Sequence, residues 1–504
     1  MNKKVILIYP EARLEGNYPN GKGHAYSITP PINLLSIALF LEEADYRCEI
    51  LDAKIEDYRD LVLDDALCVG IGSMSGMQLR NAVDIAAFVR QNAPGVPIVW
   101  GGVHPSLVPE STAKHPLVDI VVRGEGEETM VEVCDCLRDG IPLADVEGIS
   151  YKNSEGEVIH NRDRPFLDMN RIGILPYHLI DIKKYPLEAT GFPLNTSRGC
   201  PYPCKFCYNL TYNKRKWRSQ SPERVLDSIR HIIDEFGIRN FQFQVDDEFF
   251  INRERIEIIC TKIVEENLDI EWSSFNRADL IARYSDEFMS LIKKSGCKEL
   301  YIGGESGSKK MLKYIAKGIE PEDIIEASAK CSRFDIVPII SCMTAFPDET
   351  DEDRRETFRL IDKINEVNPK ANINGIFSYS PYPGTPLFET AKEKGLKELD
   401  TLDDWMHFQY DDVRRIPWLS RKERSLLFTI CKLARFPFLS DVPEYPAALG
   451  FDNATGLGKL KVAIERAGYF FLWKSSRMRW KSKFFSFAPE WKLWGWYLIR
   501  NNVW

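Results

Sequence analysis

The stretch SRGCPYPCKFCYN, residues 197–209, decides how this chain is interpreted. It places Cys200, Cys204 and Cys207 on one short segment with C-x3-C-x2-C spacing. Three thiolates this close together can each ligate one iron of a cubane cluster. The segment holds no fourth cysteine, so the fourth iron would keep a position open for a chelating small molecule. A zinc site is the alternative, but structural zinc sites usually need four ligands, often in pairs.

Apolar runs and amphipathic segments alternate along the chain from Leu194 onward. After a first strand that leads into the cysteine segment, strands are predicted at residues 240–245, 269–275, 299–302, 337–343 and 372–379. The helices predicted between them cover residues 222–235, 253–266, 286–294, 322–331 and 352–367. This alternation predicts an open parallel (β/α)6 barrel, two strands short of the closed eight-stranded TIM barrel.

A second alternating series precedes this barrel. Strands are predicted at residues 4–8, 47–51, 68–71, 98–100 and 119–122, with helices at 32–44 and 78–91. Such alternation predicts a Rossmann-like, doubly wound parallel sheet, whose ligands bind at the carboxyl ends of the strands. Three of these strands end in glycine-rich loops, GIGSMSG (70–76), GGVHPS (101–106) and RGEGEET (123–129).

The chain is therefore expected to be an α/β protein of several domains, since its 504 residues exceed one ordinary core. The predicted parts are a Rossmann-like domain at 1–140, a linker with a hairpin at 141–190, the partial barrel at 191–400 and a mainly helical C-terminal domain at 401–504. The hairpin is predicted to turn at Glu155 and Gly156, within ISYKNSEGEVIHN.

Composition and charge indicate a cytoplasmic protein that does not bind nucleic acid. The formal net charge is −8, with 44% hydrophobic and 28% charged residues. The N-terminal apolar run has five residues, whereas a signal peptide needs roughly 7–15. No stretch approaches the roughly 20 apolar residues of a membrane-spanning helix. The twelve cysteines are scattered apart from the one close group, which favours reduced thiols and a metal site over disulfides, and an oxygen-sensitive protein.

The cysteine segment, with Phe206 before and Tyr208 after its third cysteine, resembles the radical S-adenosylmethionine (SAM) superfamily. Five further segments resemble strand ends of the cobalamin-dependent branch of that superfamily: FQVDDEFF (243–250), WSSFNRAD (272–279), YIGGESGS (301–308), FPDET (346–350) and PYPGTPL (381–387). PPINLLSIALFLEEADY (30–46) and the three glycine-rich loops resemble the cobalamin-binding domain of the same branch. The resemblance covers residues 4–400, in the right order.

The resemblance implies a 4Fe–4S cluster held by Cys200, Cys204 and Cys207, with SAM chelating the open iron through its amino and carboxylate groups. One electron, passed on from a flavodoxin- or ferredoxin-type reductant, would cleave SAM to a 5′-deoxyadenosyl radical. By strand position, the residues expected to hold the methionine end and the ribose of SAM are Asp246, Asp247, Arg277, Glu305 and Ser306. The alternative for each carboxylate is a helix cap or a solvated loop residue.

The resemblance also implies a cobalamin site on the glycine-rich loops. The residues expected to lie against the corrin or its nucleotide tail are Gly72, Ser73, Gly76, Gly101, Gly102 and His104. The alternative for the glycines is the tight turns of any doubly wound sheet. Lys54 replaces the cobalt-ligating histidine of the D-x-H-x-x-G pattern, and a protonated lysine has no lone pair. We therefore expect no histidine below the cobalt, with His24 and His104 as the remaining alternatives.

By resemblance, the chain is expected to be an enzyme that methylates an unactivated carbon of a hydrophobic or natural-product small molecule. The adenosyl radical would abstract a hydrogen, and the substrate radical would take a methyl group from methylcobalamin, which a second SAM regenerates. One alternative is radical cyclisation or oxidative ring formation on a porphyrin-like or lipid substrate, and another is a cobalamin-binding sensor with a structural cluster. A methylthiotransferase is disfavoured because its extra three-cysteine domain and RNA-binding module are not seen. These motifs assign neither the substrate nor a catalytic residue.

The tail differs in charge from the rest of the chain. Residues 459–504 contain ten Lys or Arg against two Asp or Glu, together with thirteen aromatic residues. The tail thus carries +8, and residues 1–458 must carry −16 to give the total of −8. Basic and aromatic residues together suit a lipid interface, which predicts a peripheral contact with the inner face of the membrane. The alternative is a helical cap on the barrel or a contact between subunits.

Overall fold

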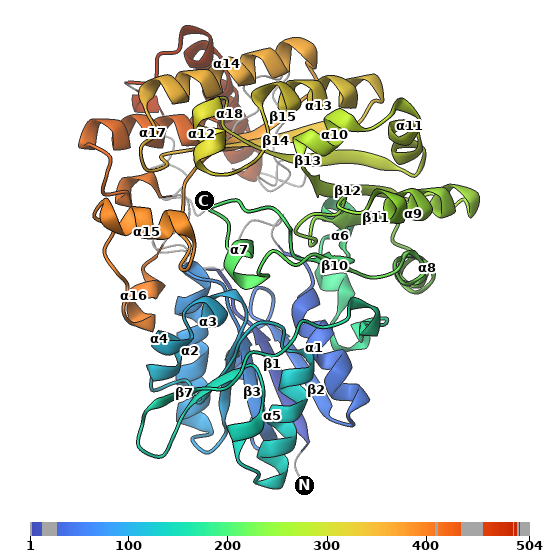
Figure 1. The fold of residues 1–504 in the computed structure, drawn as a ribbon, viewed down its shortest axis with the longest axis vertical. Helices are drawn as coiled ribbons and strands as arrows, with labels where there is room; N and C mark the ends of the chain where they lie inside the picture. Colours follow the sequence, from blue (N-terminus) through green and yellow to red (C-terminus); the bar gives the residue numbers. More distant parts are fainter. Residues whose placement is uncertain are drawn as a thin grey trace.

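The computed structural model describes residues 3–12, 28–408, 412–434, 457–486, 488–490 and 493, with the side chains of 457–466 left out. Two helix-covered sheets make up most of these residues, and Figure 1 shows the N-terminal sheet below the second one. A helical C-terminal segment runs along both. This arrangement confirms the predicted α/β class.

The first sheet has the strand order β2-β1-β3-β4-β5-β6-β7. Its parallel strands are β1 (Lys4–Tyr9), β2 (Arg47–Asp52), β3 (Ala66–Gly72), β4 (Ile98–Gly101) and β5 (Ile120–Val122). In β1, Val5 and Leu7 pack with helices α1 (Ile32–Glu43) and α5 (Glu127–Asp139), whereas Ile6 and Ile8 pack on the other face with α2 (Met77–Asn92). Burial on both faces explains the uninterrupted apolar run and confirms the doubly wound sheet.

The predicted hairpin is formed by β6 (Ile149–Lys152) and β7 (Val158–His160), with Gly156 at its turn in a left-handed conformation, φ +83°. The prediction assigned this hairpin to a linker, but β6 pairs antiparallel with β5 and extends the first sheet. The pairing covers the backbone groups that β5 would otherwise present as an open edge. Two short helices, α3 (Val103–Leu107) and α4 (Pro109–Lys114), join β4 to β5.

The second sheet is parallel throughout and has the order β15-β14-β13-β12-β11-β8. Its strands are β8 (Phe192–Pro193), β11 (Asn240–Phe243), β12 (Glu271–Asn276), β13 (Cys297–Glu305), β14 (Val337–Thr344) and β15 (Asn372–Ser378). Helices α8 (Pro222–Phe236), α9 (Arg253–Glu265), α10 (Ala278–Arg283), α11 (Asp286–Lys294), α12 (Lys309–Tyr314), α13 (Pro321–Arg333) and α14 (Asp351–Val367) alternate with these strands. The six strands confirm the predicted partial barrel.

The C-terminal segment consists of α15 (Pro386–Glu393), α16 (Leu402–Met406), α17 (Arg421–Leu433) and α18 (Leu457–Ser482). Helix α16 returns to the first sheet, where Trp405 is buried in the same apolar cluster as the inner side of α2. The segment therefore contacts both sheets. Among the residues described, no helix has the length and apolar character that crossing a membrane requires.

Candidate active site

The three cysteines lie on the loop between β9 (Ser197–Arg198) and α7 (Asn209–Tyr212). Gly199 enters this loop with φ +85°, and a Cβ there would lie 2.0 Å from the carbonyl oxygen of Lys216, so only glycine fits. Burial raises the pKa of the Cys200 and Cys207 thiols to about 12. A thiolate at these positions therefore needs a cation beside it, which iron would supply.

The donor set fits a cubane cluster better than a single ion. Within the described part of the chain, no three Cys, His, Asp or Glu side chains are placed to hold one metal ion together. A cubane cluster does not require such convergence, because each thiolate ligates a different iron. Cys200, Cys204 and Cys207 also influence one another electrostatically, as expected of neighbours around one small site.

Asp246 and Asp247 hold the chain on either side of Gly199. The Asp246 carboxylate accepts hydrogen bonds from the backbone N–H of Thr196 (2.6 Å) and Ser197 (2.9 Å) and from both hydroxyls. Burial raises the pKa of Asp246 to about 6. Asp247 accepts from the backbone N–H of Gly199 (2.7 Å) and from the side-chain amide of Asn209 (2.6 Å), which flank the cysteines. Both aspartates therefore fix the cysteine loop.

The other three residues predicted to bind SAM also contact side chains of this chain. The Arg277 guanidinium carbon lies 3.5 Å from the ring centroid of Tyr202 in the cysteine loop, and Arg277 Nε donates to Asp279 (2.9 Å). Glu305 pairs with Lys317 at 2.7 Å. The Ser306 hydroxyl lies 3.2 Å from that of Thr357. Of these contacts, the one between Arg277 and Tyr202 reaches the cysteine loop. Contact with SAM stays a prediction for all five residues.

Two buried residues of this region were missed in the sequence. Glu248 is 4% exposed, and burial raises its pKa to about 8 against the opposing effect of Arg277 and Lys317. Lys317 is 8% exposed and faces Glu305. The run Asp246-Asp247-Glu248 carried a signal for Glu248, because it follows the predicted strand at residues 240–245 and ligands of a parallel α/β sheet bind at the carboxyl ends of its strands. Nothing local distinguishes Lys317 from a surface lysine.

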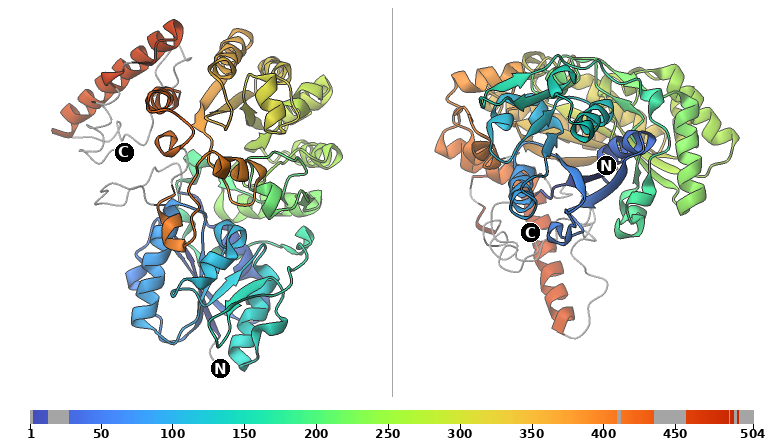
Figure 2. Two further views of the ribbon diagram at one scale, coloured as in Figure 1. Left: turned by 60° about the vertical axis from the view of Figure 1, so that its left-hand side comes forward. Right: turned by 90° about the horizontal axis from the view of Figure 1, so that it is seen from below.

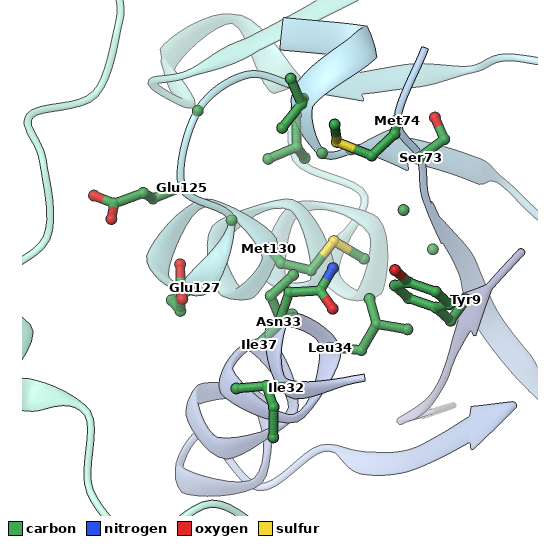
Figure 3. A pocket seen from close by; sticks show the side chains of 18 of the residues that line it. Tyr9, Ile32, Asn33, Leu34, Ile37, Ser73, Met74, Glu125, Glu127 and Met130 are labelled. Atoms are coloured by element: carbon green, nitrogen blue, oxygen red, sulfur yellow. The ribbon is translucent and has the colours of Figure 1, made fainter. Parts of the chain in front are cut away.

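A pocket of about 320 Å³ lies between the two sheets. One wall is the carboxyl end of the first sheet, where Gly72, Ser73, Gly101 and Gly102 line it, and their contact with cobalamin stays a prediction. The opposite wall comes from the second domain and includes Tyr208, Tyr212 and Asp247, next to the cysteines. Figure 3 shows Glu125 and Glu127 together at one side of this pocket and Tyr9 and Met74 at the other. The pocket thus joins the glycine-rich loops to the cysteine loop.

The lining of the pocket fits a corrin. Apolar side chains from β1, α1 and α5 form one part, and polar side chains surround it that can bond to the amides of cobalamin: Asn33, Gln78, Asn195 and Asn213. The buried hydroxyl of Ser73 has no hydrogen-bond partner among the residues that the structure describes, so a ligand can satisfy it. Gly102 has φ +96°, and a Cβ there would lie 2.8 Å from the carbonyl oxygen of Ser73. Glycine allows close approach here.

Gly76 and His104 do not line the pocket. Gly76 caps α2 with φ +86°. His104 is fully buried, its Nδ1 lies 2.9 Å from the Ser75 hydroxyl, and its ring meets Trp405 edge-on at 5.4 Å. Burial lowers the pKa of His104 to about 3, so the imidazole is neutral and faces α16. His24 lies outside the described residues.

Lys54, at the position of the missing cobalt ligand, does not itself line the pocket. Its ammonium donates to the carbonyl oxygen of Thr29 (2.7 Å) and lies 4.6 Å from the ring centroid of Tyr9, which does line the pocket. Burial lowers the pKa of Lys54, and the charge of Asp52 at 3.4 Å opposes that shift. The expectation of cobalamin without a histidine ligand stays a prediction.

Two family models match this chain: a B12 binding domain over residues 22–134 and the radical SAM superfamily over residues 194–361. An uncharacterised methyltransferase of Pyrococcus horikoshii is 32% identical over 78% of this chain and 86% of its own length. The chain belongs to the cobalamin-dependent radical SAM enzymes. Its cofactors are accordingly a 4Fe–4S cluster, SAM and cobalamin.

Solved structures of cobalamin-dependent radical SAM enzymes share this fold. The radical SAM methyltransferase TsrM of Kitasatospora setae, with cobalamin and cluster bound, superposes with a TM-score of 0.67 at 15% identity, over 95% of this chain and all of that one. The cobalamin-dependent SAM radical enzyme OxsB gives a TM-score of 0.71 at 17% identity, over 99% of this chain and 75% of that one. The sensor alternative is set aside, because the chain is a radical SAM enzyme.

Proposed function

We propose that this cobalamin-dependent radical SAM enzyme is a C-methyltransferase that acts on an unactivated carbon of a hydrophobic or natural-product small molecule. The observation that carries the proposal is the shared pocket, which is lined both by the glycine-rich loops and by Tyr208 and Asp247 beside the cysteines. The cluster with SAM supplies a 5′-deoxyadenosyl radical, and cobalamin supplies the methyl group. The chain would orient both groups toward one cavity. The relationship to the Pyrococcus methyltransferase, and to a hopanoid C-3 methylase at 26% identity, supports this choice.

Radical cyclisation is the second candidate. Anaerobic magnesium-protoporphyrin IX monomethyl ester cyclases of Synechocystis and Rubrivivax gelatinosus are 27% and 25% identical to this chain, over 77% and 78% of its length. They share both domains with the methyltransferases, so the domains cannot separate the two reactions. A ring-forming reaction leaves the methyl group of SAM out of the product.

Methylation predicts a fixed stoichiometry with methyl-labelled SAM. For each labelled product, one SAM leaves as S-adenosylhomocysteine and a second as methionine plus 5′-deoxyadenosine. The reductant supplies two electrons, one to cleave SAM and one to return cobalamin to the state that accepts the next methyl group. We expect these products at equal amounts when the reconstituted enzyme is incubated with candidate hydrophobic substrates and analysed by mass spectrometry. A reaction without reductant is the control and should give no 5′-deoxyadenosine. A converted substrate that carries no label, formed with 5′-deoxyadenosine, would identify the cyclase.

The exposed face of α18 supports a peripheral contact with an anionic membrane. The residues that would make this contact differ from the sequence-based expectation, because two of the tryptophans are buried. Trp473 and Trp480 are 7% and 3% exposed, and Trp480 Nε1 donates to Asp362 of α14 at 2.7 Å, so these two tryptophans belong to a packed cap. The opposite face of α18 carries the exposed side chains Phe471 (60%) and Met478 (71%), with Lys474 and Lys481 beside them. Figure 2 shows α18 extending beyond the helices of the second sheet. The remaining tryptophans of the tail lie outside the described residues.

Reversing this face should remove membrane binding. We expect the full chain to pellet with anionic liposomes at low salt and the quadruple variant Phe471→Ser, Lys474→Glu, Met478→Ser, Lys481→Glu to bind at least about 10-fold more weakly, since each engaged lysine contributes about 1 kcal/mol. Salt at 1 M should weaken binding of the unmodified chain, because the Debye length falls to roughly 3 Å. Ile258→Ser with Lys262→Glu, an exposed pair on α9, is the matched control. If both variants pellet to the same extent, the membrane contact is contradicted and the tail serves as a structural cap.

A further inference from the structure

Four charged side chains form a buried cluster between the two domains. Arg198 and Arg218 come from the second domain, and Glu125 and Glu127 come from the RGEGEET loop of the cobalamin-binding domain. Arg198 donates to Glu125 (2.9 Å) and to Glu127 (2.7 Å), and Arg218 donates to both oxygens of Glu125 (2.8 and 2.7 Å). The exposed fractions of the four side chains range from 4% to 18%. The two arginines of the second domain and the two glutamates of the first domain neutralise one another only when the domains are in contact.

The strand register shows why the second domain needs these carboxylates. Strands β9 and β10 (Arg218–Ser219) pair antiparallel with Arg198 directly opposite Arg218. Like charges in directly opposite positions destabilise a strand pair. Glu125 offsets this repulsion because it binds both guanidinium groups. The strand that leads into the cysteines is therefore stabilised by a residue of the other domain.

The same loop contacts the chain on both sides of the cysteines. Arg198 stands two residues before Cys200, and the hydroxyl of Tyr212, five residues after Cys207, donates to the carbonyl oxygen of Gly124 at 3.0 Å. Gly124, Glu125 and Glu127 line the pocket described above, in the position that Figure 3 shows for the two carboxylates. Residues that line this pocket thus also hold both ends of the cysteine segment.

We propose that Arg198 is a positioning residue that, through Glu125 and Glu127, fixes the 4Fe–4S cluster at one distance and orientation relative to cobalamin. Buried charge pairs offset their desolvation penalty only when their geometry is good. A small displacement between the domains would spoil that geometry and is therefore unfavourable. A charged guanidinium also bonds to two carboxylates in a fixed planar arrangement, which a flexible lysine does not reproduce. The inference rests on the two cofactors that the family shows and not on methyl transfer.

The distance between the two cofactors can be measured directly, because the reduced cluster and cob(II)alamin are both paramagnetic. In the full chain loaded with both, we expect pulsed dipolar electron paramagnetic resonance to give one narrow distance peak. Arg198→Gln and Glu127→Gln should lose that narrow peak while keeping iron and cobalamin content. Arg198→Lys should restore it only in part. Glu127→Gln keeps the shape of the side chain and leaves the cysteine segment unaltered, so it still gives the measurement if Arg198→Gln does not assemble a cluster.

The control is Arg230→Gln, which removes a comparable pair with Glu266 (2.8 and 2.7 Å) on the surface between α8 and α9. It should keep the narrow peak. An unchanged peak in both Arg198→Gln and Glu127→Gln would overturn the proposal and leave the proposed methyl transfer untouched. Loss of methyl transfer with the peak intact in the unmodified chain would instead count against the proposed function alone.

Discussion

Replacing Cys200, Cys204 and Cys207 together by alanine should remove the cluster and with it all reductive cleavage of SAM. The three thiols are the side chains that can ligate iron on the loop between β9 and α7, and burial makes the thiolates of Cys200 and Cys207 dependent on a cation beside them, which iron would supply. We expect about four irons per chain in the reconstituted unmodified protein and background iron in the variant. Iron and sulfide analysis, visible absorption and 5′-deoxyadenosine formation give the readouts.

Cobalamin binding should survive this change, because the first sheet and its glycine-rich loops contain none of the altered residues. Cys136→Ser is the control, since Cys136 lies on α5 and is partly exposed, away from the loop. It should keep a full cluster. Cluster iron retained by the triple variant, with normal visible absorption, would contradict the assignment of the ligands.

Gly102→Ala should weaken cobalamin binding at least about tenfold. Alanine at φ +96° and ψ −168° costs about 1–3 kcal/mol, and its Cβ would lie 2.8 Å and 2.9 Å from the backbone oxygen and nitrogen of Ser73. The Ser73 backbone must then move, and Ser73 lines the pocket with a buried hydroxyl that a ligand can satisfy. A loss of 1.4 kcal/mol corresponds to a tenfold rise in Kd. Equilibrium dialysis against hydroxocobalamin measures the change.

Gly95→Ala is the matched control, because a Cβ at Gly95 meets nothing within 4 Å. It should bind cobalamin as the unmodified chain does. The melting temperature of both variants separates a local change at the pocket from general loss of structure. If Gly102→Ala keeps full affinity at an unchanged melting temperature, cobalamin does not rest on this loop.

The fold could be predicted because its signals are local. Strand β1 is apolar at successive positions because each of its faces meets a helix layer, and this two-sided burial is visible in the sequence. The cysteine spacing is also local, since a short loop brings three thiols together whatever surrounds it. The position of the hairpin was predicted correctly, but the hairpin was assigned to the linker. Its pairing with β5 depends on how the sheet packs, and the local sequence does not show that.

The roles of the predicted SAM residues were harder to foresee. The local sequence around a carboxylate at a strand end is the same whether that carboxylate faces a ligand or a neighbouring loop. For Asp246, hydrogen bonds from Thr196 and Ser197 surround the carboxylate, and they join residues about 50 positions apart. His104 similarly sits in a glycine-rich loop, yet it faces Trp405, some 300 residues further along the chain.

The sequence by itself determined the two sheets and placed three cysteines and several glycines on short loops, because periodicity and spacing within a few residues fix these features. That the cysteines ligate the cluster stays a prediction. Only the tertiary structure decided that the pocket lies between the domains and that Arg198 and Arg218 meet Glu125 and Glu127. The physical reason is that a buried charge must be compensated by whatever group packs against it. The docking of the two domains determines which groups pair. The paired residues are far apart in the sequence, so no local sequence pattern predicts the pairing.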